Sequence, residues 1–183
     1  YYNSFFLNQS NVAISTVRAG NVIGGGDWST DRLIPDCIRS LSMNKDIEIR
    51  NPNSTRPWQH VLDPLRGYME LGKNMYLDSS LSGAWNFGPS HDCVKKVSNV
   101  VKALCDAWQD SESSVVFSKS DKLEREAKLL SLDSTKSSRV LGWYPRLDFQ
   151  HSIKFTVDWY KSYYSSPDQC KKAVTNQIKE YYE

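Results

Sequence analysis

Helical and strand-like hydrophobic patterns follow one another along the chain. Apolar residues recur every three or four positions in residues 65–76, 94–108 and 149–164, which predicts amphipathic helices. Runs rich in β-branched or aromatic residues predict strands at 11–19, 47–49, 84–87 and 115–117, and a short apolar run predicts another at 129–132. Further helices are expected within 31–43, over 133–142 and from about residue 167 onward.

Capping residues, prolines and glycines indicate where these helices begin and end. Residues 29–31 supply candidate caps for the first helix, which can hold Pro35 only near its start. Asp63 followed by Pro64 predicts an N-cap and a first helical residue. Gly142 predicts a helix end.

The order of the elements places the chain in the α/β class. Strands alternate with helices, which is typical of that class. A glycine-rich loop is expected at 20–30, and a turn at 51–56. Because the strands are short and few, we do not expect them to make a complete sheet.

Composition excludes several classes of function. The chain has 183 residues, which fits one domain or part of a larger one, and its formal net charge of +2 comes from interspersed charges. This balance favours neither nucleic acid nor an anionic membrane as a partner. Four cysteines without a Cys-x-x-Cys pair suit a cytoplasmic protein with reduced thiols, and no apolar run reaches membrane-spanning length. The first residues resemble no signal peptide and lack an initial Met, so we expect an N-terminally truncated fragment.

Four segments carry a resemblance to a known family. They are Val17-Arg18-Ala19-Gly20-Asn21-Val22-Ile23-Gly24 with Arg32-Leu33-Ile34-Pro35, then Arg56-Pro57-Trp58-Gln59-His60-Val61 with Asp63, then Trp85-Asn86-Phe87-Gly88-Pro89, and finally Leu132-Asp133 with Leu141-Gly142-Trp143-Tyr144-Pro145 and Thr156-Val157-Asp158-Trp159-Tyr160. Their order resembles the second half of the extended short-chain dehydrogenases/reductases that act on nucleotide sugars. The resemblance implies the C-terminal part of a Rossmann fold with a smaller mixed α/β substrate-binding domain. Residues 1–50 would hold the last Rossmann elements interleaved with substrate-binding segments, and 51–183 mainly the nucleotide-sugar-binding domain.

Two stretches resemble one branch of this family. Residues 24–28, Gly-Gly-Gly-Asp-Trp, and residues 56–60 are similar to the CDP-glucose 4,6-dehydratases. One departure is Arg125, where the branch pattern has His before a Glu-Ala pair. Another nucleotide-sugar epimerase, a TDP- or UDP-sugar dehydratase, and a non-catalytic nucleotide-sugar-binding module remain alternatives.

The resemblance implies a set of substrate-binding residues that suit a diphosphate-linked sugar. Guanidinium groups hold phosphates through paired hydrogen bonds, and an amide can both donate and accept. The substrate-binding candidates are Asn21, Arg32, Leu33, Ile47, Ile49, Arg56, Asn86 and Glu126. Leu33 and the strand 47–49 would pack against the base and ribose. We expect Asn21, Arg32, Arg56 and Asn86 to converge on the ligand.

NAD is the cofactor that the resemblance implies, with Ala19, Gly20 and Val22 near it. The family reaction moves a hydride from sugar C4 to NAD, eliminates water across C5 and C6, and returns the hydride to C6. Neither the Gly-x-x-Gly-x-x-Gly fingerprint nor the Tyr-x-x-x-Lys pair occurs in the sequence. We therefore expect the catalytic residues upstream of Tyr1, and a chain that alone is inactive and poorly folded. The family is typically dimeric, so the resemblance allows a homodimer of the full-length protein, and the sequence leaves the oligomeric state open.

Three further features concern the glycine-rich loop, Trp58 and the histidines. Gly24-Gly25-Gly26 either shapes the nicotinamide end of the pocket or is a plain flexible loop. Trp58 either stacks near the ligand or fills the core. The three histidines are too scattered to predict a metal site.

Overall fold

The structure is a computed structural model that describes residues 4–5, 12–109, 111–117 and 130–183. Its α-helices are α1 (Leu33–Ser42), α2 (Leu62–Leu77), α3 (Val97–Trp108), α4 (Thr135–Leu141), α5 (Phe149–Ser165) and α6 (Cys170–Tyr182). Its strands are β1 (Ser15–Ala19), β2 (Asn21–Ile23), β3 (Ile47–Ile49), β4 (Thr55–His60), β5 (Gly83–Phe87), β6 (Val94–Lys96) and β7 (Val115–Phe117). The alternation of helices and strands confirms the α/β class.

The described strands form three small groups. β1 pairs in parallel with β5, so that Ser15 lies opposite Gly83. β4 lies between β2, to which it is parallel, and β6, to which it is antiparallel. β3 and β7 form a parallel pair. Within the described residues the strands therefore make no complete sheet, as expected.

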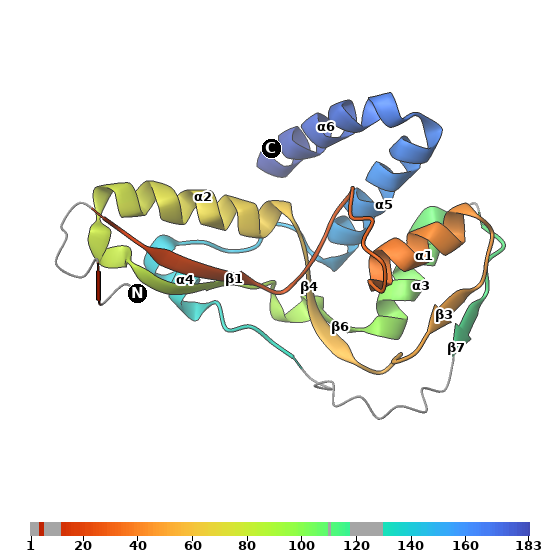
Figure 1. The fold of residues 1–183 in the computed structure, drawn as a ribbon, viewed down its shortest axis with the longest axis horizontal. Coiled ribbons are helices and arrows are strands. Elements are labelled where there is room, and N and C mark those ends of the chain that lie inside the picture. Colours follow the sequence, from red (N-terminus) through yellow and green to blue (C-terminus); the bar gives the residue numbers. More distant parts are fainter. Residues whose placement is uncertain (1–3, 6–11, 110, 118–129) are drawn as a thin grey trace.

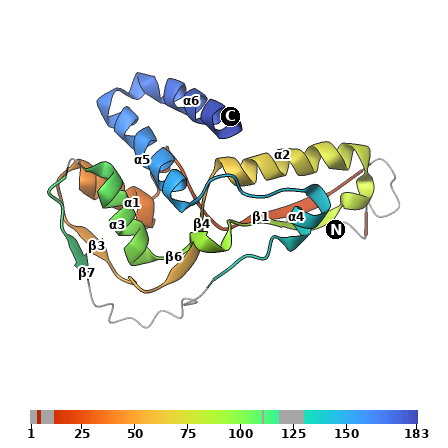
Figure 2. The same ribbon diagram turned by 180° about the vertical axis from the view of Figure 1, so that it is seen from behind.

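Two separate hydrophobic clusters hold these groups. The larger cluster joins α1, α3 and α5 to the strands β3 and β4, with Ile38, Val100 and Leu104 completely buried. The smaller cluster packs Leu71 of α2 against Trp85 and Phe87 of β5. The two clusters lie toward opposite ends of the molecule, where α2 follows the β1–β5 pair at one end and α1, α3, β3 and β7 gather at the other (Figures 1 and 2). The cavity described below belongs to the larger cluster's end.

Several strands escaped the sequence analysis. β4 occupies a segment that was expected to begin as a turn. It buries the polar residues Arg56, Gln59 and His60, so the hydrophobic pattern of the sequence does not indicate a buried strand there. β2 lies inside the expected glycine-rich loop, and β6 inside the expected helix 94–108. The strand expected at 129–132 is wrong for its described part, because residues 130–132 form none.

Two of the predicted helix starts are also wrong. The residue before α1 is Arg32, and no side-chain cap bond is made there. α2 begins at Leu62, so Asp63 lies inside its first turn. The Asp63 carboxylate instead accepts hydrogen bonds from the backbone N–H groups of Arg146 and Leu147. Asp63 thus holds a distant segment of the chain in place of capping α2. The predicted helix end at Gly142, which has a φ of 65°, is confirmed.

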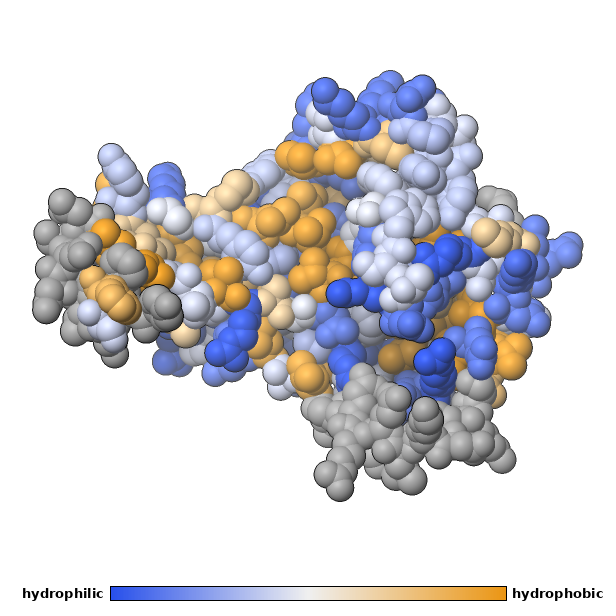
Figure 3. Space-filling model, in the orientation of Figure 1, coloured by the Kyte–Doolittle hydropathy of each residue, from blue (hydrophilic) through white to orange (hydrophobic). Residues whose placement is uncertain are grey.

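Exposed apolar side chains gather on α2 and β1. They include Val17, Leu65, Met69 and Leu77. Figure 3 shows hydrophobic surface extending from this region toward the middle of the face. In the described part of the chain, none of the helices is long and apolar enough to cross a membrane.

Candidate functional site

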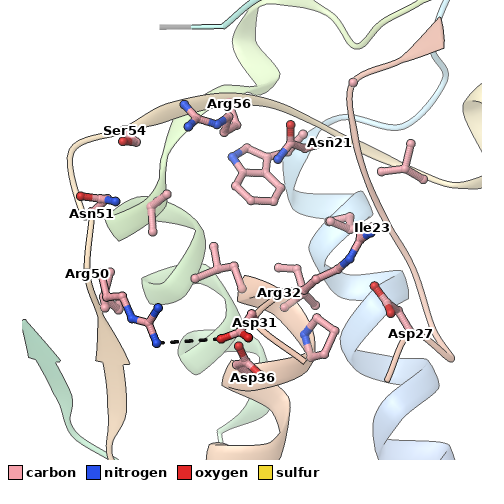
Figure 4. A pocket seen from close by; sticks show the side chains of 18 of the residues that line it. Asn21, Ile23, Asp27, Asp31, Arg32, Asp36, Arg50, Asn51, Ser54 and Arg56 are labelled. Carbon is pink, nitrogen blue, oxygen red and sulfur yellow. Dashed lines mark ion pairs between the residues drawn. The ribbon is translucent and has the colours of Figure 1, made fainter. Parts of the chain in front are cut away.

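A cavity of about 860 Å³ opens beside the larger cluster, between β2, the start of α1, the end of β3 and β4. Its walls include both charged and apolar side chains (Figure 4). The lining residues are Gly20, Asn21, Val22, Ile23, Gly24, Asp27, Asp31, Arg32, Leu33, Ile34, Pro35, Asp36, Glu48, Ile49, Arg50, Asn51, Ser54, Arg56, Trp58 and Val97. A volume of this size accommodates a ligand of several rings.

The path of the chain at Gly20 brings Asn21 to the cavity. β1 ends at Ala19, and β2 starts two residues later at Asn21, which lies opposite Trp58 of β4. A Cβ on Gly20 would lie 2.5 Å from the carbonyl oxygen of Pro57, so only glycine lets the chain pass this close to β4. Gly20 is therefore explained by strand packing.

Arg56 and Arg32 provide the positive charge that the sequence analysis placed here. Arg56 lies on β4, is only 8% exposed, and donates from Nη1 to its neighbour's carbonyl oxygen, that of Thr55, at 2.8 Å. Arg32 is exposed at the start of α1. One guanidinium is thus held by the fold and the other is free to reorient. Such a pair suits a diphosphate that approaches from solvent.

Acidic side chains share the cavity with these arginines. A hydrogen bond from the Ser29 backbone N–H lowers the pKa of Asp27, which keeps its carboxylate ionised. Asp31 lies 3.9 Å from Arg50, between the carboxylate oxygen Oδ1 and the guanidinium nitrogen Nη2. The cavity therefore offers acceptors as well as donors.

The structure brings together only part of the predicted site. Asn21, Arg32, Leu33, Ile49 and Arg56 line the cavity, as do Gly20 and Val22 of the predicted cofactor-binding set.

Three predicted residues fall elsewhere, and a fourth is not among those that the structure describes. Ile47 lies in the core, and Ala19 pairs with Phe87 inside the β1–β5 sheet. Asn86 is on β5, where its side-chain amide donates to the carbonyl oxygen of Asp133 at 3.0 Å, so it does not join the other three polar residues at the cavity. Glu126 lies outside the described residues.

Several lining residues were missed by the sequence analysis, and the charged ones among them are Asp27, Asp31, Asp36, Glu48 and Arg50. Asp27 and Asp31 lie in a loop that showed no helical or strand periodicity, and Arg50 directly follows the predicted strand 47–49. The position of Arg50 at a strand's carboxyl end was a usable signal, since ligands bind at such ends in α/β proteins. The acidic residues gave no comparable signal.

The triple glycine packs against an aromatic ring. A Cβ on Gly25 would lie 2.0 Å from Cγ of Trp159 on α5, so this position has no room for a side chain. Gly24 lines the cavity, with its added Cβ 3.0 Å from Val61. Close packing thus accounts for Gly25, in place of plain flexibility. Trp58 is both core and cavity wall, with its indole N–H donating to the carbonyl oxygen of Lys95 at 3.2 Å.

Among the described residues, no group of His, Cys, Asp or Glu side chains is arranged to hold a metal ion. The arrangement instead combines three guanidinium groups, two side-chain amides and an apolar wall in one cavity. It can bind an anionic ligand that also has a flat apolar part.

Comparisons of sequence identify relatives that match most of the chain. CDP-glucose 4,6-dehydratase of Salmonella typhimurium is 41% identical over 179 residues, which cover 94% of this chain and 49% of that protein. dTDP-glucose 4,6-dehydratase of Haemophilus influenzae is 26% identical over 149 residues, covering 74% of this chain and 41% of that protein. No protein-family model matches the chain.

Solved structures show the same fold. A UDP-glucuronic acid 4-epimerase from Bacillus cereus, in complex with UDP-glucuronic acid and NAD, superposes with a TM-score of 0.71 at 19% identity, over 88% of this chain and 48% of that one. A dTDP-glucose 4,6-dehydratase from Bacillus anthracis, in complex with NAD, gives 0.69 at 17% identity, over 94% and 50%.

The fold and the comparisons define the class of protein in which the cavity lies. The fold is that of the C-terminal part of extended short-chain dehydrogenases/reductases, the class that includes nucleotide-sugar epimerases and dehydratases. By sequence, the chain belongs to the CDP-glucose 4,6-dehydratase family, whose members are hydro-lyases. It spans about half the length of the curated relatives it matches.

Proposed function

We propose that this chain is the substrate-binding half of an NAD-dependent CDP-glucose 4,6-dehydratase, which converts CDP-glucose to CDP-4-keto-6-deoxyglucose and water. The observation that carries the proposal is the convergence of Asn21, Arg32 and Arg56 on one cavity with an apolar wall. The sequence match to the dehydratase of Salmonella typhimurium supports the choice of reaction and of CDP-glucose.

The diphosphate would lie against the two arginines. Arg56 is held on β4 by its bond to the Thr55 carbonyl, and both it and the exposed Arg32 line the cavity, where their guanidinium groups suit phosphate oxygens. Asn21 can bridge a phosphate oxygen and a sugar hydroxyl, because its amide both donates and accepts. Leu33 and Ile49 would pack against the base and ribose. Binding and orientation of the substrate are the contributions of these residues.

NAD is implied by the family and supplies the hydride acceptor when bound. The residues that the structure describes do not by themselves make a site for it, since Gly20 is explained by its contact with Pro57 and Ala19 lies outside the cavity. The catalytic residues are expected upstream of Tyr1.

The proposal includes a setting for the full-length protein. Cys37, Cys93, Cys105 and Cys170 are all free thiols, which is usual for proteins in the reducing cytoplasm. We place the enzyme there, as a homodimer in its full-length form, on the family resemblance.

Isothermal titration of CDP-glucose into the chain tests the proposal. We expect saturable binding at one site, and an affinity at least about tenfold weaker for Arg56→Lys, which keeps the charge but loses the paired donors. Arg139→Ala is the matched control, because Arg139 is exposed on α4 and does not line the cavity. Absence of saturable binding to the unmodified chain, or equal losses in the two variants, would refute the proposal.

A further inference from the structure

Asp31 and Arg50 face each other across one side of the cavity. Asp31 precedes α1, and Arg50 directly follows β3, so the two side chains reach the cavity from separate elements (Figure 4). Their side chains are 84% and 72% exposed, and 3.9 Å separates Oδ1 of Asp31 from Nη2 of Arg50. This distance exceeds the length of a hydrogen bond, so the pair is not closed on itself. Both groups retain the capacity to bind a third group between or beside them.

The backbone at Asp31 is unusual for a loop residue. Its φ of 59° lies in the left-handed region, which non-glycine residues seldom adopt, although Asp and Asn tolerate it better than most. Strained conformations of this kind persist where the surrounding structure enforces them and cluster at ligand sites. Here the strained residue carries a carboxylate that lines the cavity.

The pair has the hydrogen-bonding character of a base edge. The carboxylate of Asp31 accepts, and the guanidinium of Arg50 donates through adjacent N–H groups. Read across the pair, the order is acceptor, donor, donor. Cytosine presents the complementary order, with a donating N4 amino group followed by the accepting N3 and O2 atoms. Uracil and thymine present acceptor, donor, acceptor, which sets O4 against the carboxylate and N3–H against a guanidinium N–H.

The neighbouring apolar wall fits the same occupant. Leu33 follows Asp31 by two residues, and Ile49 immediately precedes Arg50, and both line the cavity. A flat pyrimidine can therefore pack its face on these side chains while its edge reaches the charged pair. Arg56 and Asn21 lie at a different part of the cavity in Figure 4, which leaves them to the diphosphate and sugar.

We propose that Asp31 and Arg50 together determine base specificity, selecting a cytidine diphosphate sugar over its uridine or thymidine counterpart. This inference rests on the proposed function, because it assumes that a nucleotide sugar occupies the cavity. Hydrogen bonding to Asp31 and Arg50 then explains the preference for cytosine, for which the sequence similarity gives no physical reason.

Titrations with CDP-glucose and UDP-glucose test the inference, since the two ligands differ only in the base. We expect the unmodified chain to prefer CDP-glucose at least about tenfold, the size of effect that a matched paired contact gives. Asp31→Asn keeps the shape and tolerates the left-handed backbone, but its amide can turn to donate to O4. It should reduce the preference to below about threefold, chiefly by tightening UDP-glucose binding.

Arg50→Lys and a remote variant complete the design. Arg50→Lys keeps the charge but removes the adjacent donors, so it should weaken CDP-glucose about fivefold and leave UDP-glucose nearly unchanged. Asp106→Asn removes a carboxylate from the exposed Lys102–Asp106 pair on α3, away from the cavity, and should alter neither affinity.

Each result separates this inference from the proposed function. Binding of both sugars without a preference for cytidine overturns the inference and leaves the proposed function standing. Equal weakening of both sugars by Arg50→Lys also overturns it, because a phosphate contact does not discriminate bases. Failure of both sugars to bind the unmodified chain refutes the proposed function, and the inference with it.

Discussion

Tyr181 joins two buried charged groups at the junction of α2 and α6, and replacing it with phenylalanine tests how α6 is held. Its hydroxyl accepts a hydrogen bond from Nε of Arg66 at 2.9 Å and donates one to Oδ1 of Asp63 at 2.8 Å. Asp63 is completely buried, and Arg66 is 8% exposed. Burial raises the pKa of Tyr181, so the hydroxyl keeps its proton and can serve as the donor to Asp63.

The expected loss follows from these two bonds. A hydrogen bond to a charged group contributes roughly 1.5–3 kcal/mol. Asp63 keeps the backbone N–H groups of Arg146 and Leu147, and Arg66 keeps Glu70, so neither charge is left without a partner in Tyr181→Phe. We therefore take the lower end of the range for both bonds. The free energy of unfolding should fall by about 3 kcal/mol, which lowers Tm by about 6–12 °C for a chain of this size.

Differential scanning calorimetry at neutral pH measures this shift. Tyr182→Phe is the matched control, because Tyr182 is the adjacent residue on α6 and is 51% exposed. Its Tm should change by less than about 2 °C, as for most exposed substitutions. Equal shifts in Tm for the two variants would refute the reasoning, since the hydrogen bonds of the Tyr181 hydroxyl would then contribute nothing measurable to stability.

Two further predictions concern glycines and pH. Gly25→Ala should lower the free energy of unfolding by about 1–3 kcal/mol, because its Cβ would overlap the Trp159 ring. Gly72→Ala in α2 should raise it by about 0.5–1 kcal/mol, because beyond its chain neighbours and the adjacent backbone of its own helix no described atom lies within 4 Å of the new Cβ. Urea denaturation distinguishes the two, and effects of the same sign would contradict the packing argument. Burial lowers the pKa of His60 from 6.5 to about 4, so its contribution to stability is complete above pH 6.5 and is lost as pH falls from 6.5 toward 4, by up to about 3 kcal/mol. His60→Gln should flatten the pH profile of stability in this window, and parallel profiles would show that His60 does not titrate as described.

The sequence predicted elements whose apolar residues form a short run or recur with helical spacing. α5 begins at Phe149 as its apolar spacing indicated, and β3, β5 and β7 lie where short apolar runs placed them. β4 could not be found in this way, because its buried residues include His60 and Gln59. The Gln59 amide donates to the carbonyl oxygen of Phe87, a partner 28 residues away that no local pattern reveals.

The candidate site shows the same division. Arg32, Arg56 and Asn21 were identified from motif resemblance, and the structure places all three at the cavity. Asn86 belongs to an equally good motif, yet its amide is directed to the carbonyl oxygen of Asp133. Motif resemblance specifies which residues are present, and only the strand pairing decides which cavity they face.

The location of the cavity bears on how far this chain can act by itself. Its walls include Ile49 and Trp58, which are also members of the larger hydrophobic cluster with α1, α3 and α5. The exposed strand β1 and the exposed apolar residues of α2 belong to the other end, where the smaller cluster holds β5. The walls of a substrate cavity built on the larger core do not come from the β1–β5 pair. Gly20 and Asn21, which directly follow β1, are the lining residues next to that pair. We expect unfolding to begin at exposed strand edges. It should therefore affect first the end with β1, β5 and α2, which contributes least to the cavity.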